Sequence, residues 1–124
     1  MKTIDILIAD DEPHILRALS FIFSKAGYVI DTAVNGEEAL SKCHLHVPKI
    51  AFFDLGMPKM DGIQLCRMIR AEILHQPPHI IMLRCKGQDI DKEMCLNAGA
   101  NDFMTKPFSP KEVMEKVRQL LGEE

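Results

Sequence analysis

The sequence predicts an α/β protein in which a five-stranded parallel sheet lies between two layers of helices. Short apolar segments alternate five times with segments whose apolar residues recur at helical spacing. Such strict alternation favours parallel strands, with helices on both faces and right-handed crossover connections between them. The length of 124 residues is typical of one domain, so we expect a single domain over residues 1–124.

The first two strand–helix units occupy the N-terminal third of the chain. Ile4–Ala9 has the composition of a buried strand, and Pro13 then lies where a first helical turn tolerates proline. Gly27 predicts the end of that helix. Tyr28–Ala33 predicts a second strand, and Asn35 begins the turn into a second helix.

The third and fourth units follow the same order. Ile50–Phe53 predicts a strand, and a helix follows over residues 63–73. Pro77 breaks that helix, and His79–Leu83 predicts the fourth strand. The apolar spacing then indicates a helix from about Gln88 to Ala98.

The fifth unit begins with a short strand at Asp102–Met104. Ser109 and Glu112 flank Pro110 in the pattern of a helix N-cap with a capping box. We expect the last helix to bury four apolar side chains, namely Val113, Val117, Leu120 and Leu121.

Composition excludes several classes of function. The net charge is −3 and the basic residues are scattered, so direct binding of nucleic acid is not expected. The four cysteines form no C-x-x-C pair and the five histidines lack metal-ligand spacing. No apolar stretch has the length of a secretion signal or a membrane span, which predicts a cytoplasmic protein without membrane contact.

Charged residues follow three of the predicted strands. Asp10 and Asp11 follow the first, Asp54 the third, and Lys106 the fifth. Ligands of open α/β sheets bind at this edge, and clustered carboxylates repel one another unless a cation or shared protons intervene. We therefore expect a divalent-metal site beside a reactive carboxylate. Favourable helix-dipole contacts alone could account for Asp11 and Glu12, but not for Asp54 and Lys106.

The order of these motifs resembles a known family. An acid pair follows the first strand, an Asp-x-x-x-Pro-x-x-Asp-Gly motif covers residues 54–62, and Lys-Pro-Phe covers residues 106–108. The chain closely resembles the CheY-like receiver (REC) domain of bacterial two-component response regulators over essentially its whole length. The resemblance implies a flavodoxin-like (βα)5 sandwich with strand order 2-1-3-4-5.

The resemblance also implies a metal-dependent phosphoacceptor site. Asp54 matches the carboxylate that becomes an aspartyl phosphate. Asp10 and Asp11 match the acidic pair that holds Mg²⁺, with Asp54 and the backbone carbonyl of Gly56 completing the protein ligands. Lys106 matches the lysine that contacts the phosphoryl group.

Two further roles and the partners follow from the same resemblance. Phe103 matches the aromatic switch residue, and the Lys106–Pro107 peptide bond is expected to be cis. The expected partners are a sensor histidine kinase or phosphotransfer protein and a downstream effector protein or domain, with the chain a monomer or weak dimer. Beyond its own phosphorylation and dephosphorylation, the domain is not expected to be an enzyme.

Arg84 departs from the family pattern, because receivers usually carry Ser or Thr at the end of the fourth strand. Its side chain could hold a phosphoryl oxygen, point to solvent, or pair with Asp54; we favour the solvent-facing arrangement. The alternative function is therefore a receiver that does not switch and serves as a constitutive docking or dimerisation module. A phosphohydrolase is disfavoured, because Gly56 replaces the second acid that such an enzyme would need.

Overall fold

The computed structural model describes residues 3–72, 76–85 and 92–122. All five strands are parallel, and the sheet has the order β2-β1-β3-β4-β5, which confirms the predicted fold. The strands are β1 (Ile6–Ala9), β2 (Ile30–Ala33), β3 (Ile50–Asp54), β4 (His79–Cys85) and β5 (Asp102–Lys106). The helices are α1 (Pro13–Lys25), α2 (Gly36–Leu45), α3 (Gly62–Ala71), α4 (Lys92–Asn97) and α5 (Pro110–Leu121).

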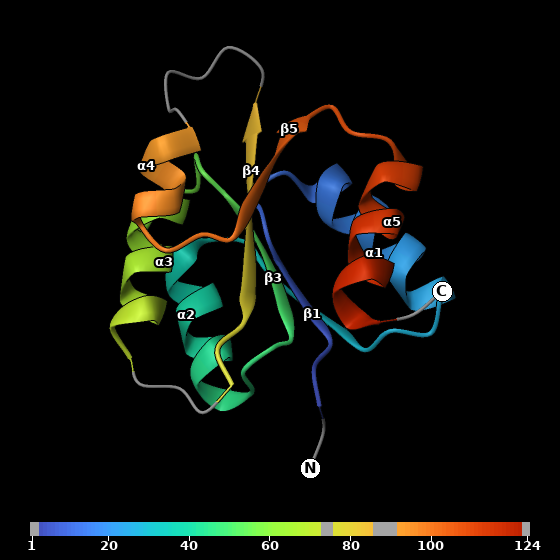
Figure 1. The fold of residues 1–124 in the computed structure, drawn as a ribbon, viewed down its shortest axis with the longest axis horizontal. Helices are drawn as coiled ribbons and strands as arrows, with labels where there is room; N and C mark the ends of the chain where they lie inside the picture. The colour runs from blue at the N-terminus through green and yellow to red at the C-terminus, as the bar shows by residue number, and fades with distance from the viewer. Residues whose placement is uncertain (1–2, 73–75, 86–91, 123–124) are drawn as a thin grey trace.

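Helices cover both faces of the sheet. Figure 1 shows α1 and α5 together on one face, and α2, α3 and α4 on the other. Alternate side chains of the strands therefore enter two separate cores. On the α1/α5 face, the rings of Phe23 and Phe52 stack with their centroids 5.7 Å apart. On the other face, Phe53 packs among apolar residues of α2, α3 and α4.

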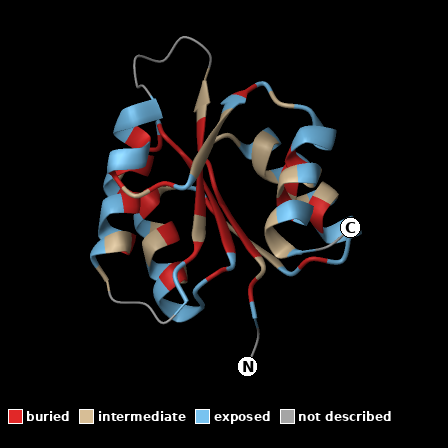
Figure 2. Ribbon diagram, viewed as in Figure 1, coloured by how far each residue is buried: buried red, intermediate tan, exposed pale blue. Residues whose placement is uncertain are grey.

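The middle of the sheet lies between these two cores and is deeply buried (Figure 2), whereas β2 and β5 at its edges are mostly half-buried. All residues of β1 and β3 are buried, including the last residue of β3, Asp54. Two-sided burial explains why these strands are continuous apolar runs in the sequence. In these two strands the one polar residue, Asp54, thus lies at the strand end, where the site is.

Several predicted boundaries are wrong by two residues. β1 begins at Ile6 and β2 at Ile30, while β4 continues to Cys85 and β5 to Lys106. The two later strands are longer because they pair with each other up to the Cys85–Lys106 register. The predicted helix residues 73 and 88–91 lie outside the described residues.

Side-chain caps fix the starts of three helices. The side chains of Asn35, Asp61 and Ser109 accept hydrogen bonds from the backbone N–H groups of Glu38, Gln64 and Glu112. At Asp61 and Ser109 the reciprocal bond is also present, so both are complete capping boxes. Pro110 occupies the first turn of α5 as predicted, and of the four expected apolar residues Val113 and Val117 are fully buried.

Two glycines allow the loop after β3 to pack closely. A Cβ at Gly62 would lie 2.7 Å from the carbonyl oxygen of Asp54, and a Cβ at Gly36 would lie 2.1 Å from that of Met60. Neither position has room for a side chain. The loop that follows Asp54 is therefore held against the start of α2 and of α3.

No helix in the described part of the chain is long and apolar enough to cross a membrane.

Candidate functional site

Asp10, Asp54 and Lys106 come together at the carboxyl edge of the sheet. Asp10 directly follows β1, Asp54 ends β3 and Lys106 ends β5. All three are buried, with 0%, 4% and 7% of their surface exposed. Among the described residues these are the buried charged side chains, so the fold places them in one pocket against the usual preference for exposure.

The three carboxylates predicted to hold a metal form one cluster. Asp10, Asp11 and Asp54 each offer an oxygen, and these oxygens lie within 4.8 Å of one another. Oxygens on opposite sides of a bound Mg²⁺ are about 4.2 Å apart, and carboxylate oxygens are ligands that Mg²⁺ prefers. The donor set and its spacing therefore fit the cation. Gly56 is exposed two residues beyond Asp54, and its role as a carbonyl ligand stays a prediction.

Lys106 is the cationic centre of the pocket. Its Nζ donates to Asp10 Oδ2 at 2.7 Å, Glu12 Oε1 at 3.0 Å and Asp54 Oδ1 at 3.3 Å. Burial alone would lower the pKa of the Lys106 ammonium, but the bonds to Asp10 and Glu12 outweigh it and raise the pKa. Lys106 therefore stays charged.

Burial has the opposite effect on the two buried carboxyl groups. It raises the pKa of Asp54 to about 6, and the nearby Asp10 charge adds to the effect while Lys106 opposes it. Burial also raises the pKa of Asp10, against the stabilising bonds from Lys106 and the Glu12 N–H. The pocket thus holds more negative charge than Lys106 alone can compensate, which favours binding of a divalent cation.

Phe103 lies on β5, three residues before Lys106. Its ring is partly buried against the α2/α3/α4 core. The guanidinium carbon of Arg84 lies 5.8 Å from the ring centroid and Lys92 Nζ lies 5.5 Å from it, both within cation–π range. The Lys106–Pro107 peptide bond that follows β5 is cis.

The position of Arg84 corrects the expectation that it points to solvent. Its side chain is half-buried beside Phe103, and its Nε atom is buried. The proposed pairing with Asp54 is also not found, because the only ion pair of Asp54 among the described residues is with Lys106. Stacking on an aromatic ring offers a guanidinium a favourable site away from water.

Sequence reasoning missed the part that Glu12 plays in the site. It was assigned only a favourable place near the start of α1, yet its carboxylate contacts Lys106 across 94 positions of sequence. The available signal was its place directly after the acid pair. That signal is weak, because acids are common near helix N-termini for electrostatic reasons.

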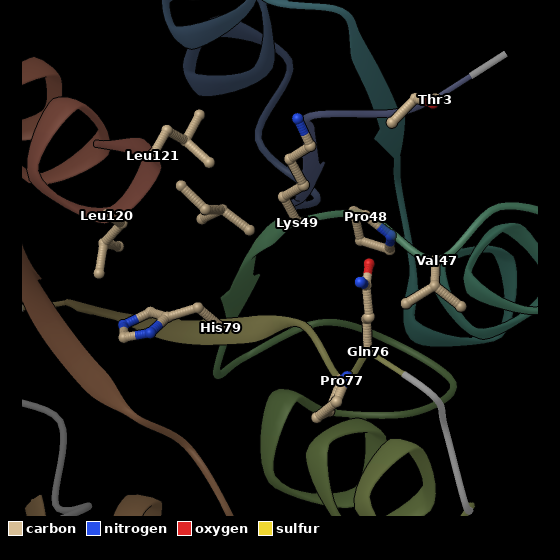
Figure 3. A pocket seen from close by; sticks show the side chains of 10 residues that line it. Thr3, Val47, Pro48, Lys49, Gln76, Pro77, His79, Leu120 and Leu121 are labelled. Atoms are coloured by element: carbon tan, nitrogen blue, oxygen red, sulfur yellow. The ribbon is translucent and has the colours of Figure 1, made fainter. Parts of the chain in front are cut away.

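A second hollow lies at the opposite edge of the sheet (Figure 3). It has a volume of about 620 Å³ and is lined by Lys49, by the first residues of β3 and β4, Ile50 and His79, and by Leu120 and Leu121 of α5. None of the predicted site residues lines it. Because parallel strands place their first residues at one edge and their last at the other, this hollow is separate from the Asp54 pocket.

Comparison with known proteins identifies the family of the chain. The sequence matches the response regulator receiver domain family over residues 6–118. The chain belongs to this family. Receiver domains are signalling modules, and the CheY-like fold predicted for the chain is the one observed.

Two curated relatives are transcriptional regulators of Bacillus subtilis (strain 168). The alkaline phosphatase synthesis transcriptional regulatory protein PhoP is 42% identical over 116 residues, which cover 94% of this chain and 48% of PhoP. The transcriptional regulatory protein ResD is 40% identical over 116 residues, 94% of this chain and 47% of ResD. The receiver chain thus spans about half the length of these relatives.

Solved structures show the same architecture. The signal receiver domain of a signal transduction histidine kinase from Syntrophus aciditrophicus is 32% identical, with a TM-score of 0.86 over 95% of this chain and 89% of that one. A CheY-like response regulator receiver domain protein from Methanospirillum hungatei JF-1 is 30% identical, with a TM-score of 0.85 over 98% of this chain and 95% of that one.

Proposed function

We propose that this receiver domain accepts a phosphoryl group on Asp54 from a phosphohistidine of a sensor histidine kinase or phosphotransfer protein. The main support for this proposal is the buried pocket in which Asp54 Oδ1 lies 3.3 Å from Lys106 Nζ, beside the carboxylates of Asp10 and Asp11. A buried nucleophilic carboxylate with a fixed cation beside it suits transfer of an anionic group.

The transfer requires one bond to form and one to break. A carboxylate oxygen of Asp54 attacks phosphorus, and the P–N bond to the donor imidazole breaks with its electron pair remaining on nitrogen. Mg²⁺, held by Asp10, Asp11, Asp54 and the Gly56 carbonyl, would neutralise charge on the phosphoryl oxygens. Lys106 supplies a second positive charge from the carboxyl end of β5. Asp54 must be ionised to attack, and Lys106 favours that ionised form.

The expected output is a change in protein–protein interactions. The relatives PhoP and ResD are named transcriptional regulatory proteins, and this chain matches only about half of each. We therefore propose that the phosphorylated domain acts on an effector protein or a further effector domain, in the cytoplasm and as a monomer or weak dimer. The domain itself provides no direct contact to nucleic acid in this proposal.

A second candidate function is a docking or dimerisation module that does not switch. The observation that favours it is the position of Arg84 and Lys92 around Phe103. Two cations near one ring would hold Phe103 in its present place whatever the state of Asp54.

The first prediction concerns the phosphorylated form of the protein. Incubation with Mg²⁺ and acetyl phosphate should add one phosphoryl group, measured by intact-protein mass spectrometry. Asp54→Asn should abolish the adduct. Asp31→Asn is the matched control, because Asp31 is also a strand aspartate paired with a lysine, Lys42, but lies outside the pocket. An Asp54→Asn protein that still gains the group would refute the assignment.

The two candidate functions predict different responses of Phe103 once Asp54 carries a phosphoryl group or its mimic. In the switching receiver, BeF₃⁻ with Mg²⁺ should shift the NMR signals of Phe103 and of its neighbours in β5. A docking module would leave these signals unchanged even where BeF₃⁻ binds at Asp54. If Arg84 and Lys92 hold the Phe103 ring in place, Arg84→Ala should allow the Phe103 signals to shift when BeF₃⁻ binds.

A further inference from the structure

Glu12 occupies the N-cap position of α1, but its side chain does not cap the helix. The side chains that cap well are short and accept a hydrogen bond from the first helical turn. The Glu12 backbone N–H instead donates to Asp10 Oδ1 at 2.9 Å. Its carboxylate reaches Lys106 Nζ through Oε1 at 3.0 Å, and His14 Nε2 lies 3.3 Å from Oε2. Helix capping therefore does not explain this side chain.

All three N–H bonds of the Lys106 ammonium have a carboxylate within reach. The distances are 2.7 Å to Asp10, 3.0 Å to Glu12 and 3.3 Å to Asp54, and only 8% of the lysine side chain is exposed. An ammonium has three donors and no acceptor, so every donor is engaged. A phosphoryl oxygen can gain a bond from Lys106 only if one of these contacts opens.

Glu12 differs from the other two partners of Lys106. Asp10 and Asp54 also belong to the carboxylate cluster that fits a cation, whereas Glu12 does not. Asp54 in addition loses its negative charge when one of its oxygens bonds to phosphorus. Among the described partners of Lys106, Glu12 is thus the one whose oxygens are needed neither for the cation nor for the phosphoryl bond.

We propose that Glu12 is a positioning residue that anchors Lys106 during phosphoryl transfer to Asp54. The inference rests on the proposed function. The contact that opens is the longest one, to Asp54, because formation of the acyl phosphate removes the carboxylate charge that sustains it. The Lys106 N–H that is released from Asp54 then donates to the adjacent phosphoryl oxygen. Asp10 and Glu12 meanwhile hold the ammonium in the pocket. Because Lys106 is already held beside Asp54, it does not have to rearrange as negative charge develops on the phosphoryl oxygens.

The first test compares two glutamate variants at saturating Mg²⁺ with acetyl phosphate as the donor. Glu12→Gln should slow adduct formation by about three- to fivefold, the effect of one half-exposed ion pair. Glu37→Gln is the matched control, since Glu37 is an exposed acid in the first turn of α2, at the same edge of the sheet. It should react at the rate of the unsubstituted protein. Equal rates for Glu12→Gln and the unsubstituted protein would overturn the inference.

A second comparison separates anchoring from a general loss of structure. If Glu12 acts through Lys106, Glu12→Gln should have no further effect in a Lys106→Met background, because interacting residues are not additive. If Glu12→Gln still slowed adduct formation three- to fivefold in the Lys106→Met background, Glu12 would not act by anchoring Lys106.

The contact itself can be measured without phosphorylation. The ¹³Cε and ¹⁵Nζ signals of Lys106 should shift in Glu12→Gln and remain in place in Glu37→Gln; unchanged signals in both would also overturn the inference. If the unsubstituted protein forms no adduct, the proposed function fails and this inference with it. If the adduct forms at an equal rate in Glu12→Gln, only the inference fails.

Discussion

His79 carries a buried ring nitrogen at the edge of the sheet opposite to Asp54. Its Nε2 has no hydrogen-bond partner among the described residues, and the ring lines the hollow with Leu120 (Figure 3). Burial lowers the pKa of His79, with Lys116 and Arg70 adding to the effect and Asp102 opposing it. A protonated imidazole is therefore less favourable here than in the unfolded chain.

This gives a prediction for the pH dependence of stability. Between the folded pKa of His79 and its ordinary value near 6.5, the unfolded chain binds more protons. The contribution of neutral His79 to stability is thus complete above about pH 6.5 and is lost as the pH falls through the folded pKa. His79→Leu should reduce the loss of unfolding free energy between pH 8 and pH 5, measured by urea denaturation.

The control for this prediction is an exposed histidine. His46→Leu should leave the pH dependence as in the unsubstituted protein, because His46 is exposed at the end of α2. An identical pH dependence in His79→Leu and the unsubstituted protein would show that His79 does not contribute.

At the level of residues, the sequence predicted the location of a side chain correctly where that location follows from the place of the residue at a strand end. Asp10, Asp54 and Lys106 could be placed in one pocket, because the ends of parallel strands meet at one edge. Glu12 and Arg84 could not be placed, because their side chains are long and reach partners that depend on side-chain conformation. The Glu12–Lys106 and Arg84–Phe103 contacts are set by packing, which the pattern of residue types does not encode.

At the scale of elements, the turn from β3 into α3 controls the position of Asp54. Gly62 is the first residue of α3, where alanine would ordinarily be the better helix former. In this structure the added Cβ would lie 2.7 Å from the Asp54 carbonyl oxygen and 3.2 Å from the Leu55 Cα. Backbone atoms cannot yield as a flexible side chain can, so the strand end must shift.

We predict that Gly62→Ala lowers both stability and phosphorylation. The expected loss is about 1–3 kcal/mol of unfolding free energy, the usual effect of overpacking, together with slower adduct formation at Asp54. The measurements are urea denaturation and the mass-spectrometric assay with acetyl phosphate.

Gly27→Ala provides the matched control for this prediction. Gly27 has a φ of +96° and no atom within 4 Å of an added Cβ, so alanine strains only its own backbone. That strain should cost about 1 kcal/mol without slowing phosphorylation. A Gly62→Ala protein that is less stable but reacts at the normal rate would show that the turn does not position Asp54.

Element boundaries were less predictable than element order. Periodicity and turn residues predicted the order of the strands and helices, and the cap at Ser109 was recognisable from residue type alone. The extension of β4 and β5 depends on their pairing with each other, which no local pattern reveals. Strand ends in a sheet are decided by the neighbouring strand as much as by their own residues.

At the scale of the whole molecule, the acidic pocket couples folding to the binding of a cation. Its carboxylates come from two separate strand–helix units and approach one another only when the sheet is complete. Their mutual repulsion weakens the fold, and a ligand that binds only the folded state reverses that loss. Mg²⁺ should therefore stabilise the protein.

The expected size of this effect is measurable by thermal unfolding. At a Mg²⁺ concentration of about 100 times its dissociation constant, binding adds about 2.7 kcal/mol to the free energy of unfolding. For a domain of this size the melting temperature should rise by about 5 °C or more. Asp11→Asn should greatly reduce the rise and Asp31→Asn should retain it; an equal rise in both variants would place the cation elsewhere.

The geometry of the two sheet edges has a practical consequence for handling the protein. Thr3, ahead of β1, and Leu121, at the end of α5, line the same hollow at the edge of the sheet opposite to Asp54. A fluorescent protein or an affinity tag fused at either end would emerge far from Asp54. Labelled versions should accordingly keep their access to a phosphodonor, which suits them to assays of transfer between immobilised and soluble partners.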